Sequence, residues 1–559
     1  MDKKLIANRT NFLLFIVIVL GFVCVVNYLA SRVFVRADLT ANKMFTISKA
    51  SKKVIKNLDD LVTLKVYISE KDLPPLAMNL TRSIKDLLSE YEAYGRGKVT
   101  VEYFDPTDNP DVKSAAQSLG LQEVPMQIIE KDKQQNVMCF MGLAILYGDK
   151  KEMIPVLNNV GNLEYDLTSR ILKVTRTEVK QVGFYFGNGP HMFTGEDMMP
   201  QNRQQQPPAS YNNIKKGLQE QFEVRAVNGL ERGEKVPSEI ATLVVAGPKS
   251  LSEREKFELD QFVMRGGRLV ALIDAMEIVT SYGVNAMKQA HNSSDLFESY
   301  GAKVEQDIVA DARSHANITY QVNYGGFVMP VSAPYPYWVT VVRGGFAADN
   351  PAVSCLQQLT FMWPSAVTTT LAKNHPSVQA LSLLKTTPFA MEFTDNFDLS
   401  PNKKWNFERD KLKGYDLGVV LTGEFNSFYS GKPVPMFKMP GDTSQMLRPA
   451  PDDATRSPLA KSSKTTVVLI GDSDFLSDGG PRESALFMVN LIEWLTLGDN
   501  LISIRSKEVD ERLIDPKLSM GAKSAISILN MGVMPLLVVA IGIFVYVRRR
   551  NRTRKGGEA

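Results

Sequence analysis

Two uncharged apolar segments near the ends constrain this 559-residue sequence most strongly. Residues 12–30, FLLFIVIVLGFVCVVNYLA, and residues 528–547, ILNMGVMPLLVVAIGIFVYV, contain no charged side chain. At about 1.5 Å of rise per residue, a helix of this length reaches about 29 Å, which is roughly the hydrocarbon thickness of a bilayer. The sequence therefore predicts two transmembrane helices, one on each side of a large central region.

Basic residues outside the two segments predict their orientation. Residues 1–11 contain Lys3, Lys4 and Arg9, and residues 548–559 begin RRRNRTRK. Because positive charge is retained inside, both termini are predicted in the cytoplasm, with the central region on the periplasmic side of a bacterial inner membrane. The ends carry most of the positive charge, so the centre is left with about −3, which excludes a nucleic-acid binder.

A first folded unit is predicted over residues 38–178. Strand-like runs such as LVTLKVYIS and KVTVEYFDP alternate with helical patterns in the order β-α-β-α-β-β-α, with Pro125 opening the third strand. This order predicts a thioredoxin-like domain. The stretch after the first strand, SEKDLPPLAMN, contains no cysteine, so thiol-disulfide exchange is excluded and a binding or packing module is expected.

A second unit is predicted over residues 179–500. Buried strand patterns, VKQVGFYFG, ATLVVAGP, RLVALID and TTVVLIGD, alternate with helical patterns, which is typical of a doubly wound parallel sheet covered on both faces. A β-rich insertion is expected at about 313–460. The predicted fold class is thus α/β, with cytoplasmic residues 1–11, a span at 12–30, the two domains, a return linker at 501–527, a span at 528–547 and a basic cytoplasmic tail at 548–559.

Two loops of the second unit hold candidate ligand contacts. The string GDSDFLSDGG places Asp472, Asp474 and Asp478 after a buried strand, at the edge where doubly wound sheets bind ligands. Turn formation and helix capping are the alternative roles, because the spacing is not that of a calcium loop. FGNGPH places Gly187 and Gly189 after another strand but lacks GxGxxG and a P-loop lysine.

An aromatic group in the insertion is the third candidate. Tyr335, Tyr337 and Trp338 predict either a face for a partner or glycan, or the packed core of the insertion. The four histidines show no metal-binding spacing, and no nucleophile elbow is present. We therefore predict no catalytic residue, cofactor or metal ligand. Whether Cys139 and Cys355 pair is left open.

Both ends of the central region resemble one known family. DLTANKMFTISKASKKVIKNLDDLVTLKVYIS after the first apolar segment, and VVLIGDSDFLSD with FMVNLIEWLTLGD before the second, resemble the gliding-motility-associated GldG family of ABC-transporter auxiliary proteins. Where members often have a GHGE-like loop, this chain has GNGP at residues 187–190. The α/β domain also resembles the glutamine-amidotransferase-like fold.

The resemblance implies a non-enzymatic scaffold or substrate-handling subunit that associates with an ABC permease, a separate ABC ATPase and membrane lipid. Two alternatives stay open: an extracytoplasmic receptor for glycan or lipid, favoured by the aromatic insertion, and an amidotransferase-like hydrolase. The hydrolase requires a nucleophilic cysteine on a strand-to-helix turn with a nearby histidine. The transported substance, the direction of transport and any part in gliding do not follow from the sequence.

Overall fold

We analysed a computed structural model of the full chain. It describes residues 46–497 together with Gly21 and Gly542. Within that span, the structure does not describe residues 70–74, 131–132, 158–159, 177–178, 195–209, 280–283, 290–292, 326, 355, 372–376, 396, 404, 439–445 and 452.

The amino-terminal region is built on a four-stranded sheet in the order β2-β1-β5-β6. Strand β1 runs parallel to β2 and antiparallel to β5, and β5 runs antiparallel to β6. The strands are β1 (Val62–Ile68), β2 (Val99–Phe104), β5 (Met141–Tyr147) and β6 (Lys150–Ile154), and the helices are α2 (Lys49–Lys56), α3 (Pro75–Gly95), α4 (Pro110–Ser118) and α5 (Val160–Thr175). The assignment of this region to the thioredoxin-like fold stays a prediction.

A separate hairpin replaces the expected third strand of that sheet. Strands β3 (Val124–Glu130) and β4 (Lys133–Cys139) pair with each other in a two-stranded sheet, and β5 takes the position beside β1. Pro125 lies in β3 opposite Met138. Its ring removes a backbone donor, which a two-stranded hairpin tolerates better than the centre of a sheet.

The second region contains a seven-stranded sheet in the order β19-β21-β24-β10-β9-β7-β8. The five strands from β24 to β8 are parallel, and β21 and β19 extend the sheet in antiparallel fashion. The strands are β7 (Gln181–Tyr185), β8 (Glu223–Ala226), β9 (Ile240–Ala246), β10 (Arg268–Leu272), β19 (Val378–Lys385), β21 (Asp416–Gly423) and β24 (Thr465–Ile470). The parallel strands follow the doubly wound order 2-1-3-4-5.

Helices cover both faces of this sheet, because the strands are apolar on both sides. One core packs α6 (Asn212–Gln219), α9 (Pro351–Ser354) and α10 (Arg482–Leu497) against side chains such as Val182, Val270 and Val468. The opposite core packs α7 (Glu253–Met264) and α8 (Ser294–Tyr300) against side chains such as Leu243, Leu269 and Leu469.

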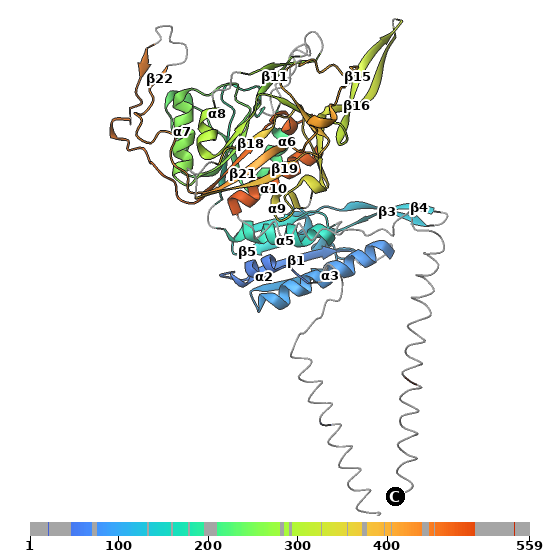
Figure 1. The fold of residues 1–559 in the computed structure, drawn as a ribbon. Coiled ribbons are helices and arrows are strands. Elements are labelled where there is room, and N and C mark those ends of the chain that lie inside the picture. The colour runs from blue at the N-terminus through green and yellow to red at the C-terminus, as the bar shows by residue number, and fades with distance from the viewer. Residues whose placement is uncertain are drawn as a thin grey trace, which may run out of the picture. The chain divides into compact units, whose positions relative to one another are not determined.

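The region predicted as an insertion, about 313–460, is only partly separate from the sheet. Its strands β19 and β21 belong to the seven-stranded sheet. The other strands of the region between β10 and β24 form small sheets (Figure 1): β11 (Met276–Val279), β12 (Asn285–Lys288), β13 (Ala302–Val304), β14 (Ile308–Asp311), β15 (His315–Tyr324), β16 (Phe327–Val342), β17 (Gln358–Thr360), β18 (Val367–Thr369), β20 (Ala390–Phe393), β22 (Phe437–Lys438) and β23 (Leu447–Arg448).

The sequence of helix α7, EREKFELDQFVM, contains six charged residues, yet the helix is buried along its length. Arg254 makes two bonds of 2.7 and 2.9 Å to the Asp453 carboxylate and contacts Glu258 at 2.9 Å. Arg456 also binds Glu258 with two bonds, 2.5 and 2.7 Å long. A segment almost 200 residues later therefore neutralises the charged face of the helix.

The predicted membrane topology is corrected by the structure. Among the described residues, no helix has both the length and the apolar character needed to cross a bilayer. This finding contradicts the fold class with two transmembrane helices and the location as a two-span inner-membrane protein. The predicted spans, 12–30 and 528–547, lie outside the described residues apart from Gly21 and Gly542. Apolar length, on which the prediction depended, is a criterion for a span but does not by itself place one.

Candidate functional site

The loops that follow four neighbouring parallel strands meet at the carboxyl edge of the seven-stranded sheet. The loop after β7 supplies His191, the loop after β9 supplies Gly247, the end of β10 leads to Asp274, and β24 leads to residues 472–474. This edge is where doubly wound sheets bind ligands. We call the polar side chains gathered here the carboxyl-edge cluster: His191, Tyr211, Asp274, Asp472, Ser473 and Asp474.

Ser473 lies at the centre of the carboxyl-edge cluster. Its Oγ donates to Asp274 Oδ2 at 2.5 Å, and its backbone N–H donates to Asp274 Oδ1 at 2.7 Å. His191 Nε2 lies 2.6 Å from Ser473 Oγ. Because the single hydroxyl hydrogen goes to Asp274, His191 donates to Ser473. A serine nucleophile requires the opposite arrangement, with histidine accepting the hydroxyl proton.

Two further members of the cluster bind the backbone of this loop. The Tyr211 hydroxyl donates to the Ser473 carbonyl at 2.6 Å. Asp472 accepts the N–H of Asp474 at 2.8 Å and the N–H of Met362 at 2.7 Å. Ser473, His191 and Tyr211 are all buried, so the internal contacts of the cluster leave the serine hydroxyl inaccessible to a substrate.

The loops that meet at the carboxyl edge contain glycines at positions where a side chain would clash. Gly247 has a φ of +57°, and a Cβ there would lie 2.4 Å from Ser473 Oγ and 2.8 Å from His191 Cδ2. At Gly189 a Cβ would lie 2.2 Å from the Gly247 carbonyl oxygen. Gly187 has a φ of +53° and faces Pro248. These glycines let the loops after β7 and β9 approach each other, a use that needs no bound phosphate.

Asp478, the third aspartate of the predicted string, caps helix α6. Its Oδ2 accepts from Asn212 N at 3.1 Å and from Ser210 Oγ at 2.5 Å, and its Oδ1 accepts from Asn213 N at 2.7 Å. The first N–H groups of a helix have no partner within the helix, and a carboxylate there is also favoured by the helix dipole. Asp478 therefore makes the contacts expected of a helix-capping residue.

Burial governs the electrostatics of the cluster. Burial raises the pKa of Asp472 well above the usual range, and the carboxyl groups of Asp474 and Asp274 add to this rise. Burial also raises the pKa of Asp274, while His191 and the bonds from Ser473 oppose the rise. Asp474 keeps 35% of its side chain exposed, so its pKa, raised by partial burial and by Asp274, reaches only about 7. A high negative charge on the cluster is therefore unfavourable.

The polar groups of the carboxyl-edge cluster make hydrogen bonds to one another and to the backbone of the loops. Among the described residues, no group of three or more His, Cys, Asp or Glu side chains is placed to hold a metal ion. The chemistry that the cluster supports is the fixing of four loops at one edge of the sheet.

The aromatic candidates lie at the base of β16, in a cluster of rings. Tyr335 and Tyr337 are buried, and their rings meet that of Trp405 edge to face at 5.9 and 4.9 Å. Trp338 is half-buried and meets Trp363. A ligand would reach the two tyrosines only after their neighbours had moved.

Residues 361–366 connect the aromatic cluster to the carboxyl edge. Trp363 donates its Nε1 hydrogen to the Tyr335 hydroxyl at 3.0 Å, while the preceding Met362 binds Asp472. Trp363 has a φ of +58°, which is rare for a bulky residue and requires support from its surroundings. The structure thus brings together Asp472 and Tyr335, which the sequence treats as separate candidates.

Asp307 supports the same connecting segment. Its Oδ1 accepts the Ala366 N–H at 2.9 Å, whereas Oδ2 is buried and has no hydrogen-bond partner in the part of the chain that the structure describes. Burial raises the pKa of Asp307 to about 6. Because the folded state holds this proton more tightly than the unfolded state, Asp307 weakens the fold as the pH rises from about 4 to about 6.

We expect Asp307→Asn to remove this pH dependence. A rise of about two pKa units corresponds to on the order of 3 kcal/mol, so the variant should gain up to that amount relative to the wild type between pH 4 and pH 7. Asparagine keeps the acceptor for Ala366. Urea unfolding of both proteins across this range measures the difference, and parallel stability curves would contradict the assignment.

The sequence predicts Asp472, Asp474 and the glycine loop as candidates, whereas Ser473, Asp274 and Tyr211 join them only in the structure. The signal for Asp274 was available, because it follows the strand RLVAL as Asp472 follows TTVVLI. No comparable signal marked Tyr211, which reaches the site from the start of α6. Cys139 is a free, buried thiol, and Cys355 lies outside the described residues.

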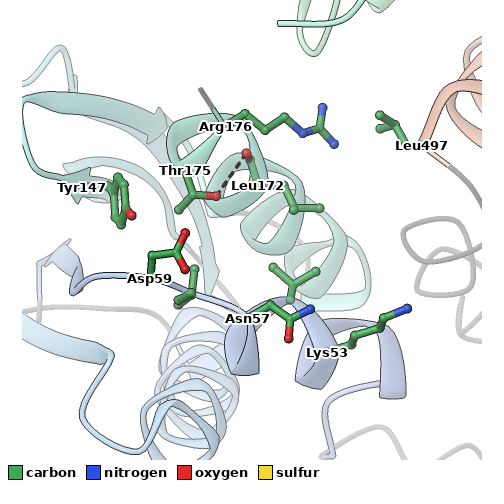
Figure 2. Close-up of a pocket in the computed structure, with 10 residues that line it drawn as sticks. Lys53, Asn57, Asp59, Tyr147, Leu172, Thr175, Arg176 and Leu497 are labelled. Atoms are coloured by element: carbon green, nitrogen blue, oxygen red, sulfur yellow. Dashed lines mark hydrogen bonds between the residues drawn. The ribbon is translucent and has the colours of Figure 1, made fainter. Parts of the chain in front are cut away.

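A separate cavity of 260 Å³ is lined by residues of the amino-terminal region and by Leu497 at the end of α10. Figure 2 shows Lys53 on α2 and Arg176 at the end of α5, with Asp59 and the apolar Leu172 and Leu497 also lining it. Its wall mixes both charges with apolar side chains. The burial of Arg176 lowers the pKa of its guanidinium group. This cavity does not contact the candidate residues predicted from the sequence.

The fold and its carboxyl-edge cluster define a mixed α/β protein with a doubly wound sheet. The family model described as an ABC-type uncharacterized transport system matches residues 179–489, more than half of the chain. The chain belongs to this family. A second model, described as a domain of unknown function, matches residues 41–146.

One relative aligns along almost the whole sequence. An uncharacterized protein of Borreliella burgdorferi is 22% identical over 537 residues, which cover 92% of this chain and 94% of that protein. The predicted kinship with auxiliary proteins of ABC-type transport is confirmed, and association with ABC-transporter components follows from it. None of these descriptions names GldG.

Two solved structures show a distant likeness. The mmIFT52 N-terminal domain is 16% identical with a TM-score of 0.30, covering 57% of this chain and 98% of that chain. A ThuA-like protein from Bacteroides uniformis is 9% identical with a TM-score of 0.24, covering 58% and 97%. At these TM-scores neither carries a functional conclusion.

Proposed function

We propose that the chain is a non-enzymatic scaffold subunit of an ABC-type transport system, and that it binds a permease and a separate ATPase. The family match over residues 179–489 is the observation that carries this proposal. The carboxyl-edge cluster supports it, because its polar groups bind one another and fix the loops after β7, β9, β10 and β24. A rigid edge of this kind suits the presentation of a binding surface.

Affinity purification of the tagged full-length chain from its source cells tests the proposal. We expect an ABC ATPase and an ABC permease to be retained in amounts comparable to the chain, and to be absent when an unrelated protein carries the same tag. Recovery of the chain without either component would overturn the proposal.

The contact between Ser473 and His191 favours a second candidate, a hydrolase. The distance of 2.6 Å is that of a nucleophile and its base, but the hydroxyl is buried and donates to Asp274. A fluorophosphonate probe, which labels activated serines, distinguishes the two functions. The scaffold proposal predicts no labelling of the folded chain, whereas labelling that is lost in Ser473→Ala would establish the hydrolase.

A further inference from the structure

The hairpin of β15 and β16 has two chemically different faces. Its register pairs Ile318 with Ala333, Tyr320 with Val331 and Val322 with Met329 without interruption. Because alternate residues of a strand project to opposite sides, these paired residues share one face. We call its outer part the apolar hairpin face: Tyr320, Val322, Phe327, Met329, Val331 and Ala333. The other face presents Asn317, Thr319, Gln321, Asn323, Val328, Pro330, Ser332 and Pro334.

The apolar hairpin face is exposed at Phe327 and Met329, and half-buried at Tyr320, Val322, Val331 and Ala333. Strand β17 pairs only with residues 340–342 of β16, so the outer hairpin is a two-stranded ribbon (Figure 1). Phe327 is 77% exposed and Met329 is 55% exposed. A two-stranded ribbon gains little stability in water by itself, and burial of exposed apolar side chains against a partner is favourable.

The base of the hairpin is held firmly. The Tyr335 hydroxyl donates to the Leu399 carbonyl at 2.7 Å and accepts from Trp363 Nε1 at 3.0 Å. Ile318 packs against the same aromatic core. The outer hairpin therefore extends from a rigid base, which lowers the entropic cost of binding through its outer part.

The charge of the ribbon restricts the partner. Residues 316–342, ANITYQVNYGGFVMPVSAPYPYWVTVV, contain no acidic, basic or histidine side chain. Nucleic acids and anionic lipid surfaces are bound through lysine and arginine, which this segment lacks. An apolar, uncharged protein surface is the complementary partner.

The size of the face excludes a dimer held by this contact alone. Strands rise about 3.4 Å per residue, so residues 327–333 extend over about 20 Å, and a ribbon about 10 Å wide offers roughly 200 Å². Two copies would bury roughly 400 Å², whereas stable interfaces bury about 1,200 Å² or more. The partner must therefore also be bound elsewhere, as is a subunit of a larger assembly.

We propose that the apolar hairpin face binds an uncharged, apolar surface on another protein component of the ABC-type transport system. The inference rests on the proposed function, which supplies an assembly that holds both proteins. The hairpin then acts as an arm whose tip adds a specific contact, with Phe327 and Met329 as its most exposed apolar anchors.

Site-specific photocrosslinking of the full chain in its source cells tests the inference. Adjacent residues provide a matched pair, because Met329 on the apolar face is 55% exposed and Val328 on the other face is 57% exposed. With p-benzoylphenylalanine replacing Met329, we expect an adduct with an ABC permease or ATPase, identified by mass spectrometry, at ten times the yield given by the probe at position 328. Equal yields, or adducts only with lipid, with a second copy or within the chain, would overturn the inference.

A purification experiment separates this inference from the proposed function. Met329→Ser combined with Val331→Ser should reduce the retained transport component at least tenfold, and the melting temperature of the variant, measured alongside, shows whether the chain is still folded. Val328→Ser should leave retention unchanged. If the wild type retains the component and the double variant retains it equally, the inference fails and the proposed function stands. If the wild type retains none, both fail.

Discussion

Glu258→Ala is expected to lower the free energy of unfolding by about 3–5 kcal/mol, the cost of removing one partner from a buried ion-pair network. Glu258 is fully buried and binds both Arg254 and Arg456. After the substitution Arg254 keeps Asp453, whereas Arg456 loses both of its bonds to Glu258. Two guanidinium groups then remain beside α7 with a single carboxylate.

Equilibrium urea unfolding of the folded chain measures this effect. Glu408→Ala is the matched control, because Glu408 also forms an ion pair, with Lys411, but both side chains are about half exposed. Solvent screens such a pair, so we expect no measurable change. An effect of Glu258→Ala as small as that of Glu408→Ala would show that the network does not stabilise α7.

Gly247→Ala is expected to cost about 2–5 kcal/mol and to disrupt the carboxyl-edge cluster. The left-handed backbone alone costs a residue with a Cβ about 1–2 kcal/mol, and overpacking adds about 1–3 kcal/mol. The overpacking arises because the new methyl group would lie 2.4 Å from Ser473 Oγ and 2.9 Å from Asp274 Oδ2. Either the hydroxyl or the loop after β9 must move.

Gly148→Ala separates the two contributions. Gly148 has a φ of +55°, almost that of Gly247, but a Cβ there would meet no atom within 4 Å. We therefore expect only the backbone cost, about 1–2 kcal/mol, in the same unfolding experiment. Equal losses at the two glycines would mean that the cluster is not closely packed.

Part of the candidate site follows from the sequence, because strand ends in a parallel sheet converge. The sequence predicts Asp472 and Asp474 as candidates because they follow a buried strand, and both lie at the carboxyl edge. The contact between Ser473 and Asp274 depends on which strands are neighbours in the sheet. That order is a tertiary property, so the local sequence does not predict the contact. Tyr335 was ambiguous because exposed and buried aromatic residues have the same local pattern.

Long-range packing also explains the main differences in the fold. The sequence of α7 carries charges around the whole helix and is typical of an exposed surface, but Asp453 and Arg456 cover it from a distant segment. Strands β19 and β21 lie inside the predicted insertion, yet they extend the central sheet because their backbone groups pair with its edge. Neither the ion pairs of α7 nor the pairing of β19 and β21 can be recognised in the local sequence pattern.

We propose that this chain is a stable structural component of an ABC-type transport assembly. Native mass spectrometry of the complex purified on the tagged full-length chain measures its composition directly. We predict a species containing this chain, an ABC permease and an ABC ATPase in a fixed ratio. A chain that is released only as a monomer or as a homo-oligomer, free of both components, would contradict the claim.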